Sequence, residues 1–416
     1  MIKILEGKPI KERNMLGSYT PWIKDVINYN ERPLSFMHEK WDDVETWKKE
    51  ARKQFIRYTL PPELNSPPHV TVTNTFQYDG LIVEELEWHF GYGPKTEAYF
   101  FRPVGSRGRL PGVLGLHDHG GNKFFGKSKI TRPYDPRDPF LKEYQETYYG
   151  GVGWASELAK RGYGVLVHDA FTFESRKIFA SSLPGYVVKR LMSHPEDIEE
   201  ITPEDLASGK PVTDYDHSES PSSEEINRYN SFAGQHETII AKSLFSAGLT
   251  WAGVYTAEDR AALDYLVSRE EIDSSRIACC GLSGGGLRTD YLAGMDDRIS
   301  CAVSVGFMTT WKDFAVHTAF THTWMIYIPG LSALMDFPDI LSMRAPKPTM
   351  VMATEEDPLY TLSEGREAEK LLQNVFDKAG SAKNFEMRYY RGPHKFDLAM
   401  QKDAFDWIDR HIAGAS

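Results

Sequence analysis

RIACCGLSGGG, residues 276–286, is an apolar run that turns on glycines around one serine, Ser283. The residues that follow, Leu287 to Met295, have a helical composition. Residues 281–285 thus fit the G-x-S-x-G pattern, in which a serine stands at a tight turn between a strand and a helix. Glycines are needed there because side chains on the neighbouring residues would block the passing backbone. This context predicts that Ser283 is a nucleophile, with the free N–H groups of a helix facing a developing oxyanion.

The composition is that of an ordinary globular protein. The 416 residues are 41% hydrophobic and 26% charged, enough for one large domain with an appendage or for two modest domains. The net charge of −11 argues against nucleic-acid or anionic-membrane surfaces, since both require a basic face. We therefore expect neither nucleic acid nor membrane as a partner.

Two features bear on the compartment. Residues 1–8 lack the apolar core of a secretory signal, and no apolar run is long enough to cross a bilayer. The three cysteines, two of them adjacent on the predicted strand, indicate buried small hydrophobes and not a disulfide framework. Unless a mature form has lost its signal, these features predict a cytoplasmic protein.

Residues 1–68 show helical patterning without strands, clearest in Trp41–Glu50, and end in two proline pairs. We predict an N-terminal helical extension, packed over the site entrance or against a partner subunit. The second arrangement would be compatible with a homo-oligomer.

Residues 69–416 are predicted to form one α/β catalytic domain. Alternating strands open a sheet in antiparallel fashion, and from 112–116 onward strands and helices alternate, which is typical of a parallel sheet with crossover helices. The expected strands are 69–76, 81–88, 97–103, 112–116, 164–169, 276–282, 300–305, 349–353 and 385–390, and the expected helices are 154–161, 257–268, 287–295, 364–378 and 396–412.

Two long insertions, about 173–246 and 307–346, follow strands of the parallel part. They should emerge at the carboxyl edge of the sheet, where open α/β sheets bind ligands, so we interpret them as lid or pocket-wall segments. The acidic part of the first insertion, 194–225, could equally be a solvated loop.

A nucleophilic serine needs a base, and that base needs an acid that fixes its tautomer. In the elbow fold the chain order is serine, acid, histidine. His394 is the one histidine between the last strand and the last helix, and Asp357 follows the strand 349–353. Glu355 and Glu356 are alternative acids that we expect to be solvated.

The oxyanion requires preorganised N–H donors. One should be the backbone N–H of Gly284, the residue after the nucleophile, and the second should come from the loop after the first parallel strand. That loop reads HDHGG at residues 117–121, and we assign the N–H of His119.

Other histidines suggest further interpretations. His117 and His119, together with Asp118, His168 and Asp169, could suggest a metal, but no metal-binding spacing supports one, so we expect neither a metal nor another cofactor. His322 and Trp324 belong to an aromatic stretch that we interpret as pocket wall or core packing. As pocket wall, both are candidate substrate contacts.

Several of these motifs together resemble the dienelactone-hydrolase-like and acetyl xylan esterase-like α/β-hydrolases. The resemblance covers about residues 95–412 and rests on DRAALDYL at 259–266, IDSSRI at 272–277, GLSGG at 281–285, LHDHGG at 116–121, DPL at 357–359 and GPH at 392–394.

The resemblance implies an α/β-hydrolase fold, a mostly parallel central sheet flanked by helices, with Ser283, Asp357 and His394 as nucleophile, acid and base. Residues 169–176 are similar to the segment after the fourth core strand of such esterases, which makes Arg176 a candidate substrate contact. The sequence departs from the family in two places. The nucleophile is not the cysteine of true dienelactone hydrolases, and the loop reads His-Asp-His where many relatives have His-Gly-His.

These observations predict a serine carboxylesterase that works through an acyl-enzyme, without a cofactor, on a small-molecule ester. Short acyl esters, for example acetyl groups on sugars, are the expected substrates. The alternatives are a peptidase or thioesterase with the same triad, and a non-catalytic binding protein that has kept the hydrolase scaffold.

Overall fold

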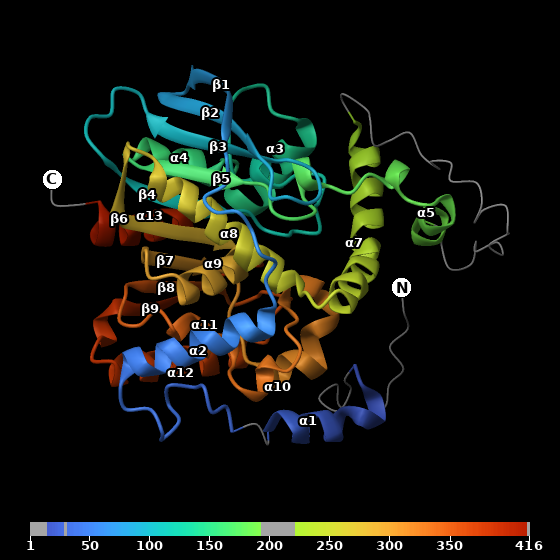
Figure 1. The fold of residues 1–416 in the computed structure, drawn as a ribbon, viewed down its shortest axis with the longest axis vertical. Coiled ribbons are helices and arrows are strands. Elements are labelled where there is room, and N and C mark those ends of the chain that lie inside the picture. The colour runs from blue at the N-terminus through green and yellow to red at the C-terminus, as the bar shows by residue number, and fades with distance from the viewer. Residues whose placement is uncertain (1–14, 29–30, 193–220, 414–416) are drawn as a thin grey trace.

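A nine-stranded sheet runs through the centre of the computed structural model, which describes residues 15–28, 31–192 and 221–413 (Figure 1). The strand order is β1-β2-β3-β5-β4-β6-β7-β8-β9. Pairings from β1 to β5 are antiparallel, and those from β5 through β4 to β9 are parallel. The strands are β1 Thr71–Tyr78, β2 Leu81–Trp88, β3 Thr96–Pro103, β4 Leu110–Leu116, β5 Gly164–His168, β6 Ile272–Leu282, β7 Ile299–Val305, β8 Thr349–Thr354 and β9 Phe385–Tyr390. Each predicted strand is present within a few residues of its expected bounds.

The central strands are buried on both faces, so their apolar runs supply two cores. Successive side chains of a strand point to opposite faces, and accordingly Cys280 and Val303 lie in one core while Cys279 and Ala302 lie in the other. Helices α4 (Trp154–Lys160) and α13 (Leu398–Ile412) cover the first face, and α8 (Trp251–Ser268) and α9 (Gly284–Met295) cover the second. Figure 1 shows this layering, with α8 and α9 in front of the sheet and α13 behind it.

The described residues of the N-terminal region include two α-helices, α1 (Thr20–Asn28) and α2 (Val44–Thr59). The carboxylate of Asp43 accepts the N–H of Thr46 at 2.8 Å and begins α2, and Leu60, in the left-handed conformation, ends it. Helix α2 packs on the body of its own chain. It lies beside α8, and its Phe55 meets the ring of Tyr291 on α9 at 5.3 Å.

The first insertion contains a long helix, α7 (Ser223–Ser246), which the sequence analysis did not expect. Its start coincides with residues that we had grouped with the acidic stretch. Ser222 and Glu225 form a capping box, which satisfies the free N–H groups of the first turn. Helix α5 (Gly185–Met192) lies beyond α7, away from the sheet (Figure 1). Residues 1–8 and most of the acidic stretch, 194–220, lie outside the described residues.

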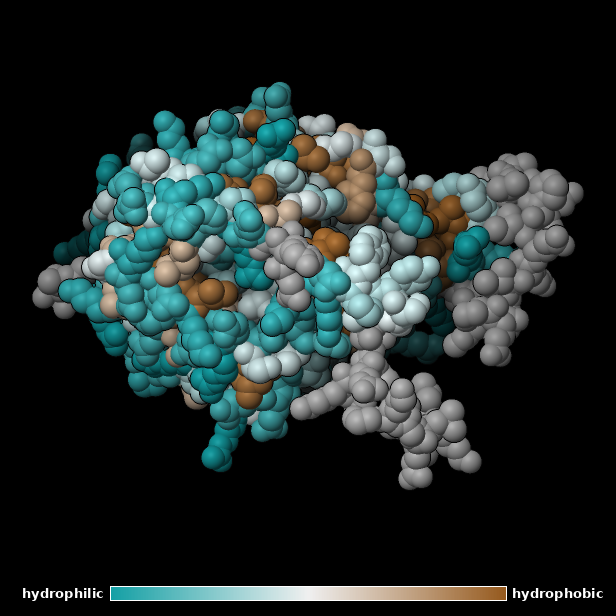
Figure 2. Space-filling view, turned by 90° about the horizontal axis from the view of Figure 1, so that it is seen from below, coloured by the Kyte–Doolittle hydropathy of each residue, from teal (hydrophilic) through white to brown (hydrophobic). Residues whose placement is uncertain are grey.

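Four further α-helices are present in the described residues. They are α3 (Pro139–Tyr149), α10 (Trp311–Asp313), α11 (Phe337–Ser342) and α12 (Leu362–Lys378). Within the described ranges, no helix combines the length and the apolar character that a membrane span requires. Figure 2 shows one face of the molecule, largely hydrophilic, with hydrophobic residues in small scattered groups.

Replacing Phe55 by alanine should lower the free energy of unfolding by about 3–5 kcal/mol, because the buried ring fills space between α2 and α9. The matched control is its neighbour Ile56, which is 39% exposed and whose alanine variant should change stability by about 0.5 kcal/mol or less. Urea denaturation of both variants measures the difference. Equal losses would show that α2 does not belong to the cooperative core.

Candidate active site

Ser283 stands at the junction of β6 and α9 in a strained backbone conformation, with φ 59° and ψ −117°. Its N–H donates to the carbonyl of Val305 at 2.7 Å. The flanking glycines allow a close approach of the β4 backbone. A Cβ atom would lie 2.4 Å from the carbonyl oxygen of Leu116 at Gly281, and 2.1 Å from it at Gly285. The predicted turn is present, and only glycine fits beside it.

His394 and Asp357 lie together, as the spacing predicted. Nδ1 of His394 is 2.6 Å from Oδ2 of Asp357, and Oδ1 of the same carboxylate accepts the N–H of Leu359 at 2.9 Å. Because a carboxylate only accepts, Nδ1 carries the proton and Nε2 is left as a base. Glu355 and Glu356 are exposed, so the structure brings only Asp357 to the histidine.

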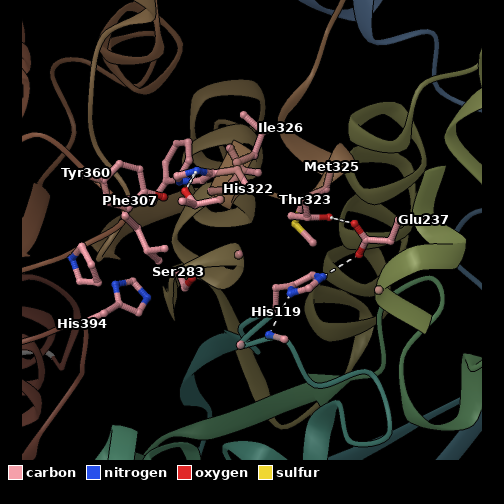
Figure 3. A pocket seen from close by; sticks show the side chains of 18 of the residues that line it. His119, Glu237, Ser283, Phe307, His322, Thr323, Met325, Ile326, Tyr360 and His394 are labelled. Carbon is pink, nitrogen blue, oxygen red and sulfur yellow. Dashed lines mark hydrogen bonds and ion pairs between the residues drawn. The ribbon is translucent and has the colours of Figure 1, made fainter. Parts of the chain in front are cut away.

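Ser283 and His394 line the same pocket, which has a volume of about 440 Å³ (Figure 3). Nε2 of His394 is buried and makes no hydrogen bond to any described residue, Ser283 included. Catalytic hydrogen bonds are often unformed before substrate arrives. Nε2 of His394 is thus a candidate base in the pocket that this residue shares with Ser283.

Two backbone N–H groups lie beside the serine. Gly284 begins α9, and a Cβ atom at Gly284 would lie 3.0 Å from the backbone nitrogen of His119. The side chain of His119 points elsewhere. Its Nδ1 accepts the N–H of Gly121 at 3.0 Å, so Nε2 carries the proton and donates to Glu237 at 2.7 Å. The imidazole of His119 is thus engaged with Gly121 and Glu237, and its backbone nitrogen lies near Gly284.

Glu237, on α7, is a pocket residue that sequence reasoning missed. Besides His119, its carboxylate meets the ammonium of Lys123 at 3.0 Å and accepts the hydroxyl of Thr323 at 2.7 Å. Burial opposes its charge, but Lys123 and His119 outweigh burial and hold the pKa of Glu237 well below its usual range. This carboxylate joins both insertions to the loop after β4 (Figure 3).

The signal for Glu237 was present in the sequence. Ile226, Tyr229, Ala233 and Glu237 recur at helical spacing after the capping box and are buried in the structure. Reading that periodicity would have placed Glu237 on the inner face of a helix.

His322 and Trp324, the two candidate substrate contacts from the aromatic stretch, lie in different places. His322 lines the pocket, where burial lowers its pKa to about 4, and its Nδ1 lies 3.1 Å from the carbonyl oxygen of Thr318. Trp324 is not among the residues that line this pocket. It lines a neighbouring apolar hollow of about 390 Å³, and its Nε1 donates to the hydroxyl of Thr238 at 3.3 Å.

The prediction that Arg176 contacts substrate is wrong. Its side chain is 1% exposed and does not line the pocket. The guanidinium donates to Glu258 at 2.7 Å and to the carbonyl of Pro94 and the hydroxyl of Thr96, each at 3.0 Å. A buried charge requires such partners, so Arg176 has a structural role. Its hydrogen bonds link Thr96 on β3 to Glu258 on α8.

The histidines that could have suggested a metal are engaged in hydrogen bonds. Nε2 of His117 accepts the N–H of Ala170 at 3.1 Å, and Nε2 of His168 is 2.9 Å from Asp259. Burial lowers the pKa of His117 well below its usual value, so this ring is neutral.

The chain is similar to proteins of known sequence or structure. The prolyl oligopeptidase family matches residues 245–414. A protein of Bacillus subtilis (strain 168), "Putative hydrolase YtaP", is 24% identical over 367 residues, which cover 87% of this chain and 99% of that protein.

Two solved structures share the fold at low identity. The first is described as "a putative acetyl xylan esterase" from Bacteroides fragilis NCTC 9343 and has a TM-score of 0.63 and 17% identity, covering 92% of this chain and 84% of that chain. The second, a glucuronoyl esterase from Solibacter usitatus, has a TM-score of 0.55 and 15% identity, with coverage of 89% and 94%.

The fold and the comparisons define the class of protein. The chain is an α/β-hydrolase with a mostly parallel sheet flanked by helices. It is a serine hydrolase, and the two solved structures that share its fold are described as esterases.

Replacing Gly285 by alanine should destabilise the protein by about 1–3 kcal/mol or more, because the added Cβ atom meets backbone that cannot move aside. Gly234 on α7 is the matched control. A Cβ atom there meets open space, so alanine should stabilise the helix by up to about 1 kcal/mol. Thermal unfolding monitored by circular dichroism distinguishes them, and an unchanged melting temperature for G285A would contradict the proposed close approach.

Proposed function

We propose that this serine hydrolase cleaves short acyl esters of neutral alcohols, for example acetyl groups on sugars. Ser283 is the nucleophile, His394 the base, Asp357 the acid, and the backbone N–H groups of Gly284 and His119 form the oxyanion hole. The observation that carries the proposal is that His394, held by Asp357 at 2.6 Å, lines one pocket with Ser283.

The chemistry follows from these positions. Nε2 of His394 takes the proton of Ser283 while Oγ attacks the ester carbonyl, and Asp357 stabilises the resulting imidazolium. The carbonyl oxygen gains negative charge as it becomes tetrahedral, and the two N–H groups stabilise that charge. His394 then returns the proton to the departing alcohol, leaving an acyl-enzyme that water hydrolyses by the reverse sequence.

The charge of the pocket favours a neutral ester. No lysine or arginine is among its described lining residues, and the negative charge of Glu237 is already paired with the ammonium of Lys123. A phosphate-bearing acyl-CoA or a free uronate would find no cation to pair with there. The polar wall that includes Thr321, His322 and Thr323 is suited to hydroxyl groups of the alcohol part, and we propose His322 as a substrate contact. Trp324 is not proposed as one, because it lines the neighbouring hollow.

Peptide hydrolysis is a second candidate function, because the family that matches residues 245–414 is the prolyl oligopeptidase family. Peptidases and esterases share the acyl-enzyme chemistry. Aminoacyl-naphthylamides and acetyl esters distinguish the two.

We also propose a cytoplasmic location. All three cysteines are unpaired and buried, which suits a reducing compartment.

Replacing Ser283 by alanine should abolish hydrolysis of p-nitrophenyl acetate and labelling by a fluorophosphonate, because both require the hydroxyl. Ser300, at the start of β7, provides the control. Its hydroxyl donates to the carbonyl of Ser275 on β6, away from the pocket lining, so its alanine variant should keep wild-type rates. Unchanged turnover in S283A would overturn the proposal. A wild-type protein that cleaves only aminoacyl-naphthylamides would favour the peptidase.

Replacing Asp357 by asparagine should lower kcat by about 10²–10⁴-fold, because the amide no longer stabilises the imidazolium or fixes its tautomer. Substituting Glu356 by glutamine makes the same chemical change one residue away, on an exposed side chain, and should leave kcat within about twofold of wild type. Initial rates with p-nitrophenyl acetate measure both variants. If E356Q were the impaired variant, the acid would be misassigned.

A further inference from the structure

The loop after β4, residues 117–122, carries the proposed oxyanion donor, and an ammonium group lies behind it. Lys129 is fully buried. Its Nζ donates to the carbonyl oxygen of Asp118, to that of His119 at 3.2 Å and to that of Asn122 at 3.1 Å. A single cation therefore binds three carbonyl groups of one short loop.

The peptide between residues 118 and 119 links this cation to the pocket. The carbonyl of Asp118 and the N–H of His119 belong to the same peptide plane, and in a trans peptide the two groups point in opposite directions. With the carbonyl bound to Lys129, the N–H must point away from the ammonium. Gly284 lies close to this nitrogen, because a Cβ atom at Gly284 would be 3.0 Å from it.

We propose that Lys129 is a positioning residue of the oxyanion hole, which orients the His119 N–H toward Ser283 by holding the loop carbonyls inward. The proposal rests on the function proposed above. It assigns no contact between Lys129 and the substrate, because Lys129 does not line the pocket.

Asp118 completes the arrangement and accounts for the departure of this loop from His-Gly-His. Its carboxylate lies 3.4 Å from Nζ of Lys129 and accepts the hydroxyls of Tyr144 and Tyr149. A buried ammonium is stable only beside such a counter-charge. Gly120 is required in the same place, because a Cβ atom there would lie 1.7 Å from the hydroxyl oxygen of Tyr144.

Burial lowers the pKa of Lys129 to about 8, although Asp118 favours the charged form. Because this folded-state pKa lies below the ordinary value, the ammonium is present below about pH 8 and is lost above it. The neutral amine has two N–H groups for the three carbonyls, so the loop should loosen as the pH rises. The titratable groups around Lys129 are His117, Asp118, Tyr144, Asp169 and Glu174.

The test compares full-length variants between pH 6 and 10, with p-nitrophenyl acetate as substrate. Replacing Lys129 by methionine together with Asp118→Asn removes both charges and leaves no unpaired carboxylate. We expect kcat to fall by about tenfold or more with KM within about twofold of wild type, and labelling by a fluorophosphonate to slow in parallel, because the lost orientation matters in the tetrahedral state. Wild-type kcat should decline above about pH 8, and the double variant should lack this decline.

Lys127 is the matched control. It is buried two residues away, but its ammonium pairs with Glu97, Asp169 and Glu174 and not with the loop carbonyls. K127M should lose stability and yet keep the decline of kcat above about pH 8. If the double variant does not fold, K129R tests the same point, since a guanidinium does not titrate in this range and should remove the decline.

Each outcome decides the proposal. Wild-type kcat and an unchanged alkaline decline in the folded Lys129 variants would overturn it while the proposed esterase activity stands. The proposal would also be overturned, with the esterase activity still standing, if K127M removed the decline of kcat above about pH 8. An S283A variant as active as wild type would overturn the proposed function, and the role of Lys129 with it.

Discussion

The close contact between two backbone segments, the end of β4 and the β6–α9 turn, is the constraint on which the site depends. The carbonyl oxygen of Leu116 occupies the space that side chains at residues 281 and 285 would need. This contact sets Ser283 in its strained conformation and brings the next residues of the β4 loop beside the start of α9. The proposed nucleophile and the proposed oxyanion donors are thus positioned by packing between backbones, which is less adjustable than packing between side chains.

Buried charges hold the segments that backbone packing leaves free. Glu237 ties α7 and the second insertion to His119, and Lys129 and Asp118 support the same loop from behind. Such groups are costly to bury unless they are fully paired, so they specify one loop arrangement more than they add stability. They surround the pocket without placing a cation in its described lining, which leaves that lining suited to neutral ligands.

Most of the fold could be predicted from local patterns in the sequence. The strands could be predicted because each is a short apolar or alternating run bounded by turn residues. The positions of Ser283, Asp357 and His394 followed from one motif and from chain order at strand ends. Helix α7 was not predicted, because the acidic and proline residues before Ser222 suggested a solvated loop. The helical spacing of apolar residues after Ser222 was therefore overlooked.

The role of Arg176 could not be predicted from the sequence, because its partner Glu258 is on α8, far along the chain, and only the fold brings them together. The same holds for Lys129, whose carbonyl partners carry no signature in the sequence. Contacts made to backbone atoms, or between distant segments, are set by tertiary structure and leave no local pattern.

The alternation of Cys279 and Cys280 across the two faces of β6 has a practical consequence. Both thiols, and that of Cys301, are fully buried, and burial raises the pKa of each well above its ordinary value. Thiolates are the reactive species, so the native chain should be nearly silent toward maleimide reagents while it stays folded. A single cysteine introduced on the outer face of α7 would then be an isolated attachment point for a fluorophore or spin label, and the motion of this helix during turnover could be followed without first removing the native cysteines.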